Sequence, residues 1–390
     1  MKKMFLDIFF QQFSVAASAL ILLVFHFFIG RFGGTQIYGE FSFIMAALSF
    51  YAILMDGGFK TLIFRESVGG SVKQLKRNAF SYSFLTAAAG IVIFTFIFGS
   101  FGLSLVSVLF FFLFVFINMI FAEIKGKGNF RLEGVMNVCL RLLQLISVVL
   151  IIKFISPFSI FTAMSLSFII FILLIYKRAG LKEWLSGFNI DFGILKLAFP
   201  FIVIDFLTSI YFRIDIIIIN YLLDKNSVAL YSSAYKFVEG LILIFTPVTL
   251  VIFRKFREKH LEGERQKSLI FTVLGLSFAF SVICILFFMK FGDNIMLLTF
   301  GKEYASAVPV LFVLGFSLIF IFPNGFLTQF AIAENRERYY ALTVTVVTFV
   351  NIVLNIILIP SLGINGAAYA TIASEMILFL FLFTKTLQRI

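Results

Sequence analysis

The chain has 390 residues, of which 61% are hydrophobic and 13% are charged, and its net charge is +12. A soluble domain carries about 25% charged residues, and single cores stop growing near about 250–300 residues, so this composition excludes an ordinary soluble fold. Apolar runs such as 101–121 and 202–219 suit helices that cross a hydrocarbon core roughly 30 Å thick. We therefore expect an all-α polytopic membrane protein.

About twelve apolar segments are predicted to span the membrane. In chain order they are residues 5–29, 38–62, 80–99, 101–122, 134–155, 157–176, 197–222, 228–253, 269–289, 306–332, 339–359 and 365–384. They predict an N-lobe of six helices (1–180), a cytoplasmic linker (181–196) and a C-lobe of six helices (197–390). The linker contains the only tryptophan, Trp184. An amphipathic segment anchored in the membrane interface by this ring and a plain solvated linker are both open interpretations.

The basic residues alternate between the two sides of these segments. Only five occur in one set of connections, namely Arg31, Lys153, Lys225, Lys290 and Lys302, whereas the other connections and both termini hold nearly all of the rest. Because Lys and Arg are retained in short cytoplasmic loops, this bias predicts that both termini are cytoplasmic. The positive charge is thus explained by membrane topology, and nucleic acid is not an expected partner.

Charged residues inside the predicted spans are the main functional candidates, because a charge at the centre of a helix costs about 2.5–3.5 kcal/mol on insertion scales. At 100° per residue, Asp205, Arg213 and Asp215 share one face of 197–222. Lys236 and Glu239 share one face of 228–253 at a similar depth. One interpretation is an anion site that faces a cavity. The other is a pair of structural salt bridges, Arg213 with Glu239 and Lys236 with Asp215.

Arg141 lies near the middle of the predicted span 134–155. The only acidic residue nearby on that helix is Glu133 at its start, so Arg141 is the best candidate for an unpaired cation. Glu375, in 365–384, is a further intramembrane acid. The chain has no GxxxxGK[ST] motif, and its two histidines and two cysteines match no metal spacing. No catalytic residue, metal or cofactor is therefore expected.

Several stretches resemble the polysaccharide transporters of the multidrug/oligosaccharidyl-lipid/polysaccharide exporter superfamily. They are Tyr38-Gly-Glu-Phe, Asp56-Gly-Gly, Ala198-Phe-Pro, Arg213-Ile-Asp, the segment from Ala229 to Glu239 and, most specifically, the segment from Asn351 to Thr371. Together they point to Wzx-type flippases of O-antigen or capsule repeat units. The resemblance spans nearly the whole chain.

The resemblance implies two lobes around a central cavity that opens alternately to each face of the inner membrane. The substrate would be an oligosaccharide on undecaprenyl pyrophosphate, moved from the cytoplasmic to the periplasmic leaflet for O-antigen, lipopolysaccharide or capsule synthesis. Membrane lipid, a polymerase and a chain-length regulator are the other implied partners. By position, Arg141, Arg213 and Lys236 would bind the pyrophosphate, and Asp205, Asp215 and Glu239 would couple an ion. With Glu375 included, these residues are not net positive.

Three alternatives compete with this prediction. A drug or organic-cation exporter of the same superfamily would have to place cationic substrate beside Arg213 and Lys236, which would repel it. A membrane enzyme of envelope synthesis, such as a polymerase, needs a sizeable outer loop, and no predicted outer connection is long. A scaffold protein would not need Arg, Lys, Asp and Glu together at mid-membrane depth.

The topology can be tested with cysteines in a background lacking Cys139 and Cys284. We expect a cysteine at Asn226, in the predicted periplasmic loop, to react with an impermeant thiol reagent in whole cells, because this loop faces outward. A cysteine at Glu262 should react only after the cells are opened. The reverse pattern would overturn the orientation.

Overall fold

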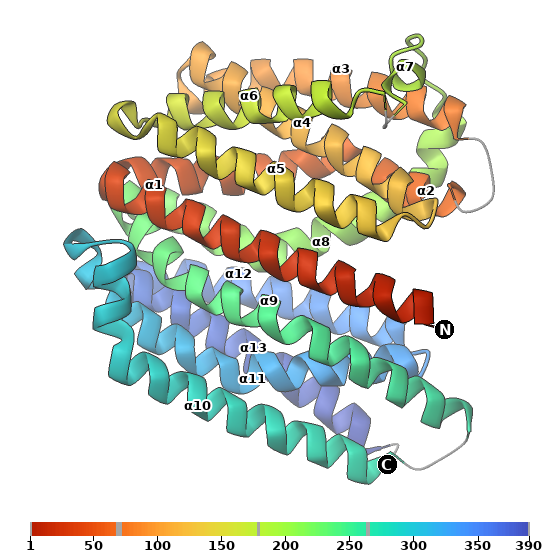
Figure 1. Ribbon diagram of the computed structural model, residues 1–390. Coiled ribbons are helices and arrows are strands. Elements are labelled where there is room, and N and C mark those ends of the chain that lie inside the picture. Colours follow the sequence, from red (N-terminus) through yellow and green to blue (C-terminus); the bar gives the residue numbers. More distant parts are fainter. Residues whose placement is uncertain (1, 68–71, 178–179, 263–265, 389–390) are drawn as a thin grey trace. The chain divides into compact units, whose positions relative to one another are not determined.

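In a computed structural model, which describes residues 2–67, 72–177, 180–262 and 266–388, the chain is helical and these residues form no strand (Figure 1). The α-helices are α1 Lys2–Asp56, α2 Phe59–Glu66, α3 Lys73–Phe98, α4 Phe101–Gly126, α5 Phe130–Leu150, α6 Pro157–Ile175, α7 Leu181–Trp184, α8 Phe192–Leu222, α9 Lys225–Leu261, α10 Lys267–Thr299, α11 Val308–Ala333, α12 Glu337–Leu362 and α13 Ile364–Leu387. Two short 3₁₀ helices are η1 Ile152–Phe154 and η2 Lys302–Ala307.

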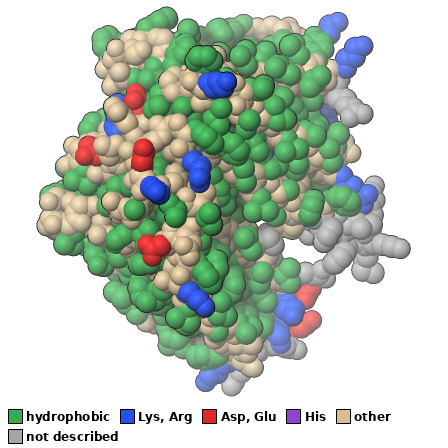
Figure 2. Space-filling model, turned by 60° about the vertical axis from the view of Figure 1, so that its left-hand side comes forward, with side chains coloured by type: hydrophobic (Ala, Val, Ile, Leu, Met, Phe, Trp, Pro, Cys, Tyr) green, Lys and Arg blue, Asp and Glu red, His purple; other side chains and the backbone are tan. Residues whose placement is uncertain are grey.

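Ten helices in the described part are long and apolar enough to cross a membrane. The 55 residues of α1 extend over about 80 Å at 1.5 Å per residue, which is enough for two spans. With α1 counted twice and α8 added, the helices accommodate the predicted twelve. Figure 2 shows hydrophobic side chains over much of the face in view, as lipid contact requires. The predicted fold class, an all-α polytopic membrane protein, is confirmed.

The two spans of α1 meet at Gly34, whose backbone has φ 70° and ψ −179°. Residues with a Cβ rarely adopt this conformation. A Cβ built at Gly34 would also lie 2.9 Å from the Oε2 atom of Glu303 in η2. The backbone is therefore not helical at Gly34, and two helices meet there across a kink, within the connection 30–37 that the sequence predicts.

The chain forms two compact units, which are described separately below. The first unit comprises Met1–Gly33 and Ile44–Ile210, and the second comprises Gly34–Phe43 and Tyr211–Ile390. The division therefore falls within α8, between Ile210 and Tyr211, inside the segment 197–390 that the sequence predicts as the C-lobe. The linker and the start of α8 belong to the first unit.

Within the first unit, α4 packs against α2, α3 and α6. The ring of Phe110 on α4 lies 5.7 Å from that of Phe161 and 5.3 Å from that of Phe168, both on α6. These aromatic contacts form most of the core between the two helices, and the Ser165 hydroxyl on α6 adds a hydrogen bond to the Val106 carbonyl on α4 at 3.2 Å. A run of apolar residues on α4 is accordingly buried on most sides.

The first unit also packs α1 against α5 in parallel. The guanidinium of Arg131 lies 5.1 Å from the ring centroid of Phe10, and a Cβ built at Gly134 would lie 2.7 Å from the Ser14 hydroxyl. Because the paired residues follow the same order on both helices, the helices run in the same direction. Two odd-numbered spans of an alternating topology must have this relation.

Within the second unit, α11 occupies the centre and packs against α9, α10 and α13. The ring of Phe245 on α9 lies 4.3 Å from that of Phe322 on α11 and 5.8 Å from that of Phe280 on α10. Since α11 has no charged residue along its length, it suits this central position. Its few polar side chains bond to its own backbone, as Ser317 does to the Leu314 carbonyl, or to a neighbouring helix, as Asn324 does to Glu375 on α13.

The linker is docked on the first unit by Trp184. This side chain is fully buried, and its ring lies 5.4 Å from that of Phe116 on α4. Further along, the backbone N–H of Asn189 donates to the Ser81 hydroxyl at 3.0 Å. The interpretation of Trp184 as an anchor in the membrane interface is therefore wrong, because protein side chains and not lipid headgroups surround the ring.

A buried ion cluster lies beneath the same linker. Lys76 is 2% exposed and its Nζ lies 2.5 Å from Glu123 and 2.9 Å from Glu183, while Lys127 pairs with Glu123 at 2.5 Å. The hydrogen bond from Lys76 holds the pKa of the exposed Glu183 below its ordinary value. Glu183 therefore stays ionised at neutral pH, and the cluster ties α7 to α3 and α4.

Lys76→Met should destabilise the protein by about 3 kcal/mol, because it removes the buried partner of Glu123 and leaves this acid with only the exposed Lys127. Thermal unfolding of purified protein and protease cleavage of the linker would measure this effect. Arg65→Met is the control, because Arg65 pairs with Glu66 in an exposed position and such pairs contribute about 0–1 kcal/mol. Equal melting temperatures for the two variants would contradict the role assigned to Lys76.

Candidate functional site

The second unit contains a buried hydrogen-bonded group formed by three helices. Asp215 on α8 accepts from the backbone N–H of Ile216 at 2.8 Å and from the hydroxyl of Tyr231 on α9. The same hydroxyl lies 3.4 Å from the Oγ1 atom of Thr371 on α13. Asp215 and Tyr231 are both buried. The three side chains thus link α8, α9 and α13. A carboxylate that faced lipid would have no such hydrogen-bond donors.

The helical hairpin between α8 and α9 sets this arrangement. Asp224 caps α9, and its side chain accepts from the N–H of Ser227 at 2.7 Å. Counted from this cap, Asp215 and Tyr231 lie at similar depths on adjacent antiparallel helices. One turn further along α9, the ring of Tyr235 stacks on that of Tyr231 at 6.0 Å and 13°.

Arg213, Lys236 and Glu239 extend the polar group. Lys236 pairs with Glu239 on its own helix at 2.5 Å, and both side chains are partly exposed. Arg213 interacts electrostatically with Asp215 and Glu239. The salt bridge between Lys236 and Asp215 that was considered from sequence does not form. Lys236 pairs with Glu239 instead, and Asp215 accepts a hydrogen bond from Tyr231.

Arg141 lies on α5, which belongs to the first unit, whereas Arg213, Lys236 and Glu239 belong to the second. Its guanidinium donates to Oε1 of Gln144 at 2.9 Å, and Gln144 is 2% exposed. Within the described part of the chain, no acidic side chain pairs with Arg141, and the Nε2 of Gln144 has no hydrogen-bond partner. Arg141 therefore keeps the capacity to bind an anion.

A cavity of about 250 Å³ in the first unit was not predicted from sequence. Its polar lining consists of Ser49, Asp56, Lys60, Asn118 and Ser209. Asp56 is buried and accepts from the backbone N–H of Lys60 at 3.3 Å. The Asp56-Gly-Gly stretch was recognised only as part of a resemblance, and the break between α1 and α2 at these glycines is the signal that could have indicated a polar cavity.

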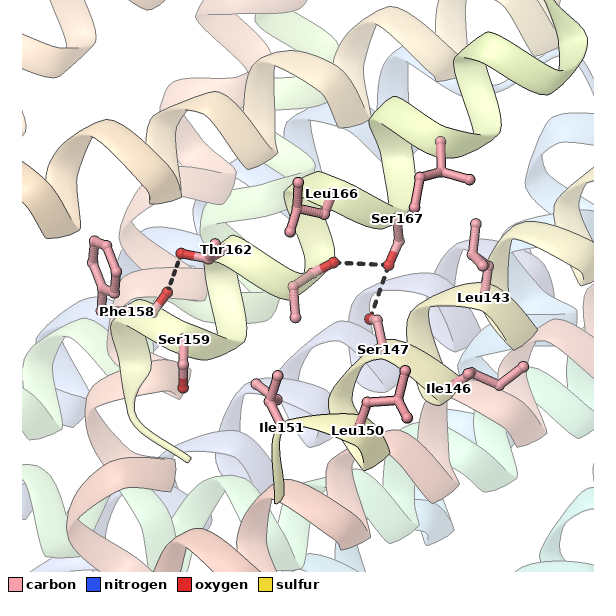
Figure 3. Close-up of a pocket in the computed structure, with 12 residues that line it drawn as sticks. Leu143, Ile146, Ser147, Leu150, Ile151, Phe158, Ser159, Thr162, Leu166 and Ser167 are labelled. Carbon is pink, nitrogen blue, oxygen red and sulfur yellow. Dashed lines mark hydrogen bonds between the residues drawn. The ribbon is translucent and has the colours of Figure 1, made fainter. Parts of the chain in front are cut away.

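A second cavity, of about 400 Å³, lies between α5 and α6 (Figure 3). Apolar side chains such as Leu143, Ile146 and Leu166 line it, and the hydroxyl of Ser167 donates to that of Ser147 at 2.8 Å. The lining has no charged side chain, so this cavity is not a site for phosphate.

Two further results concern the predicted site and metals. Asp205 lies within α8, but its side chain is outside the described part of the structure. Among the residues that are described, no group of three or more His, Cys, Asp or Glu side chains could hold a metal ion.

The fold is that of known membrane transporters. It matches the lipid II flippase MurJ, inward closed, with a TM-score of 0.75 over 96% of this chain and 87% of that one, at 16% identity. An inward-facing multidrug resistance MATE transporter of the MOP superfamily matches with a TM-score of 0.74, over 94% of both chains at 13% identity. The chain therefore has the fold of MOP superfamily transporters. No family model matches the sequence.

Sequence similarity narrows this class. The probable low-salt glycan biosynthesis flippase Agl15 of Haloferax volcanii is 30% identical over 168 residues, which cover 42% of this chain and 35% of the relative. The capsular polysaccharide biosynthesis protein CapF of Staphylococcus aureus is 28% identical over 168 residues, 41% of each protein. The chain thus matches less than half the length of these relatives. The predicted resemblance to polysaccharide transporters is confirmed.

Tyr231→Phe should lower stability by roughly 1–3 kcal/mol, because it removes a donor from buried Asp215. Tyr235→Phe makes the same chemical change one turn away, where the described structure shows no hydrogen bond of the hydroxyl, and should have little effect. Thermal unfolding of both purified variants gives the comparison. If Tyr235→Phe costs as much as Tyr231→Phe, the Asp215–Tyr231 contact does not stabilise the unit.

Proposed function

We propose that the protein is a flippase that moves undecaprenyl-pyrophosphate-linked oligosaccharide repeat units from the cytoplasmic to the periplasmic leaflet of the inner membrane by alternating access. The polymer would be O-antigen or capsule, and both chain termini would be cytoplasmic. The fold it shares with a lipid II flippase and its partial likeness to a glycan flippase support this assignment. The observation that carries it is Arg141, an arginine within a span that no described acid neutralises.

Arg141, Arg213 and Lys236 bind the pyrophosphate in this proposal. A charge-assisted hydrogen bond to phosphate contributes about 1.5–3 kcal/mol, and arginine can form two at once. Arg141 has a single neutral partner, Gln144, so an anion need not displace an existing ion pair. Lys236 must exchange its contact with Glu239, which makes its binding dependent on the state of that acid.

Asp205, Asp215 and Glu239 couple an ion in the same proposal. Asp215 is the clearest of the three, because it is buried and its described hydrogen bonds come from a hydroxyl and a backbone N–H, while Arg213 acts on it only electrostatically. Glu239 shares its charge with Lys236 and Arg213. A polymerase and a chain-length regulator would act on the product after it reaches the periplasmic leaflet.

A drug or organic-cation exporter is the second candidate, favoured by the match to a multidrug resistance MATE transporter. Arg213 and Lys236 disfavour it, because a cationic substrate would meet two like charges in a low-dielectric setting. A polymerase is disfavoured because the similar proteins are flippases and transporters.

Deletion of the gene should abolish the surface polysaccharide and leave lipid-linked repeat units on the inner leaflet, because synthesis continues while export stops. Extraction of lipid-linked oligosaccharide and a surface polymer assay measure both effects. Normal surface polymer in a deletion strain without other flippases would refute the proposed function.

Arg141→Ala should reduce complementation of that deletion at least tenfold at unchanged protein abundance, because it removes a contact of about 1.5–3 kcal/mol. Arg141→Lys should restore part of it, since the charge remains but the bidentate geometry is lost. Arg131→Ala removes an exposed arginine at the start of the same helix and serves as the control. Full activity of Arg141→Ala would exclude Arg141 from the substrate site.

A further inference from the structure

A second buried acid lies in the core of the second unit, between α11 and α13. Glu375 is 7% exposed, and Asn324 is 4% exposed. The Nδ2 atom of Asn324 donates to the Oε2 atom of Glu375 at 2.7 Å and to its backbone carbonyl at 2.9 Å. Both hydrogens of the amide are thus used on one residue. The pair is a built contact across two helices and not a chance approach of two side chains.

The same asparagine leaves its acceptor unused. Its Oδ1 atom is buried and has no hydrogen-bond partner in the described part of the structure. A buried polar atom without a partner costs about 1–3 kcal/mol, and most buried polar groups avoid this cost. A hydrogen-bond donor beside the Glu375 carboxyl group would therefore stabilise the structure by pairing with this amide oxygen.

Protonation of Glu375 supplies such a donor. An ionised carboxylate only accepts hydrogen bonds, whereas a neutral carboxyl group has one O–H that donates. An O–H directed at Oδ1 of Asn324 would satisfy the unused acceptor, while Nδ2 keeps its bond to the other carboxyl oxygen. The neutral form also avoids burying a charge in a hydrocarbon setting.

The groups around Glu375 come from every helix that packs against α13. On α9 the facing titratable group is Tyr235, and on α12 it is Tyr340, both of which interact electrostatically with Glu375. On α11 there is no titratable side chain, and Asn324 is the contact. Tyr235 also interacts electrostatically with Asp215, Glu239 and Arg213, so it is in electrostatic range of both Glu375 and the candidate site.

We propose that Glu375 and Asn324 form a proton-binding site in which the carboxylate takes up one proton and donates it in a hydrogen bond to Oδ1 of Asn324. No other bond is formed or broken. The use of this proton as the coupling ion of transport rests on the proposed function. The binding of the proton itself does not depend on the proposed function.

Infrared spectroscopy of the purified full-length protein tests the binding step directly. In spectra recorded from about pH 5 to pH 9, we expect the C=O stretching band of protonated carboxyl groups to include a component that is absent in Glu375→Gln and shifts in Asn324→Leu. Glu262→Gln, the same change at an exposed position, should leave the band unchanged. Identical spectra of the wild type and Glu375→Gln over this range would overturn the proposal.

Sodium is the competing ligand for a site of this kind. The melting temperature of the wild type should be the same in sodium and potassium chloride at constant pH. If sodium stabilises the wild type and Glu375→Gln abolishes this stabilisation, the site binds sodium and the proposal of a proton site is overturned.

The coupling step has a separate readout. Glu375→Gln keeps a neutral side chain with a donor, so it should fold at normal abundance but complement the deletion strain at least tenfold less well. Full complementation would remove the coupling role. A deletion strain with normal surface polymer would remove the flippase function and leave the infrared result standing.

Discussion

Every polar group in this protein is subject to one constraint, which is that hydrocarbon offers no hydrogen bonds. A carboxylate or guanidinium inside a span must therefore find its partners within the protein, on its own helix or on a neighbouring one. Asp215 meets this requirement through a hydroxyl of α9, and Glu375 through an amide of α11. The polar contacts therefore determine which helix faces pack together, while the apolar side chains fill the remaining space.

The spans and the fold class could be predicted from sequence because lipid selects long apolar segments independently of their neighbours. Glycine positions were harder to interpret. A Gly in a polar stretch normally indicates a turn, and the helical backbone does break at Gly34, between the two spans of α1. Gly57 and Gly58 separate α1 from α2, inside the segment 38–62 that the sequence predicts as one continuous span. The local pattern is similar, and tertiary contacts decide between the outcomes.

The partners of the intramembrane charges could not be predicted for a related reason. A helical period places Lys236 and Asp215 on suitable faces, but it does not say which rotamer reaches which atom. Lys236 reaches Glu239, one turn away on its own helix, because a local pair needs no particular packing. The prediction for Trp184 was wrong because it depended on packing that the sequence does not show. A tryptophan ring is typical of the membrane interface, but this one is buried against Lys76 and Phe116.

Charge in the second unit connects the two proposals. Arg213 and Lys236 oppose Asp215, Glu239 and Glu375, so protonation of Glu375 makes this group more positive by one charge whatever the state of Asp205. At a distance of about 10 Å and an effective dielectric constant of about 20, one charge changes the energy of a bound anion by roughly 1.7 kcal/mol. Tyr235, which interacts with Glu375 and with Arg213, Asp215 and Glu239, lies where this change would be felt. The protonation state of Glu375 would then change the affinity of this polar group for an anion, which is the physical link between the proposed proton site and the proposed substrate.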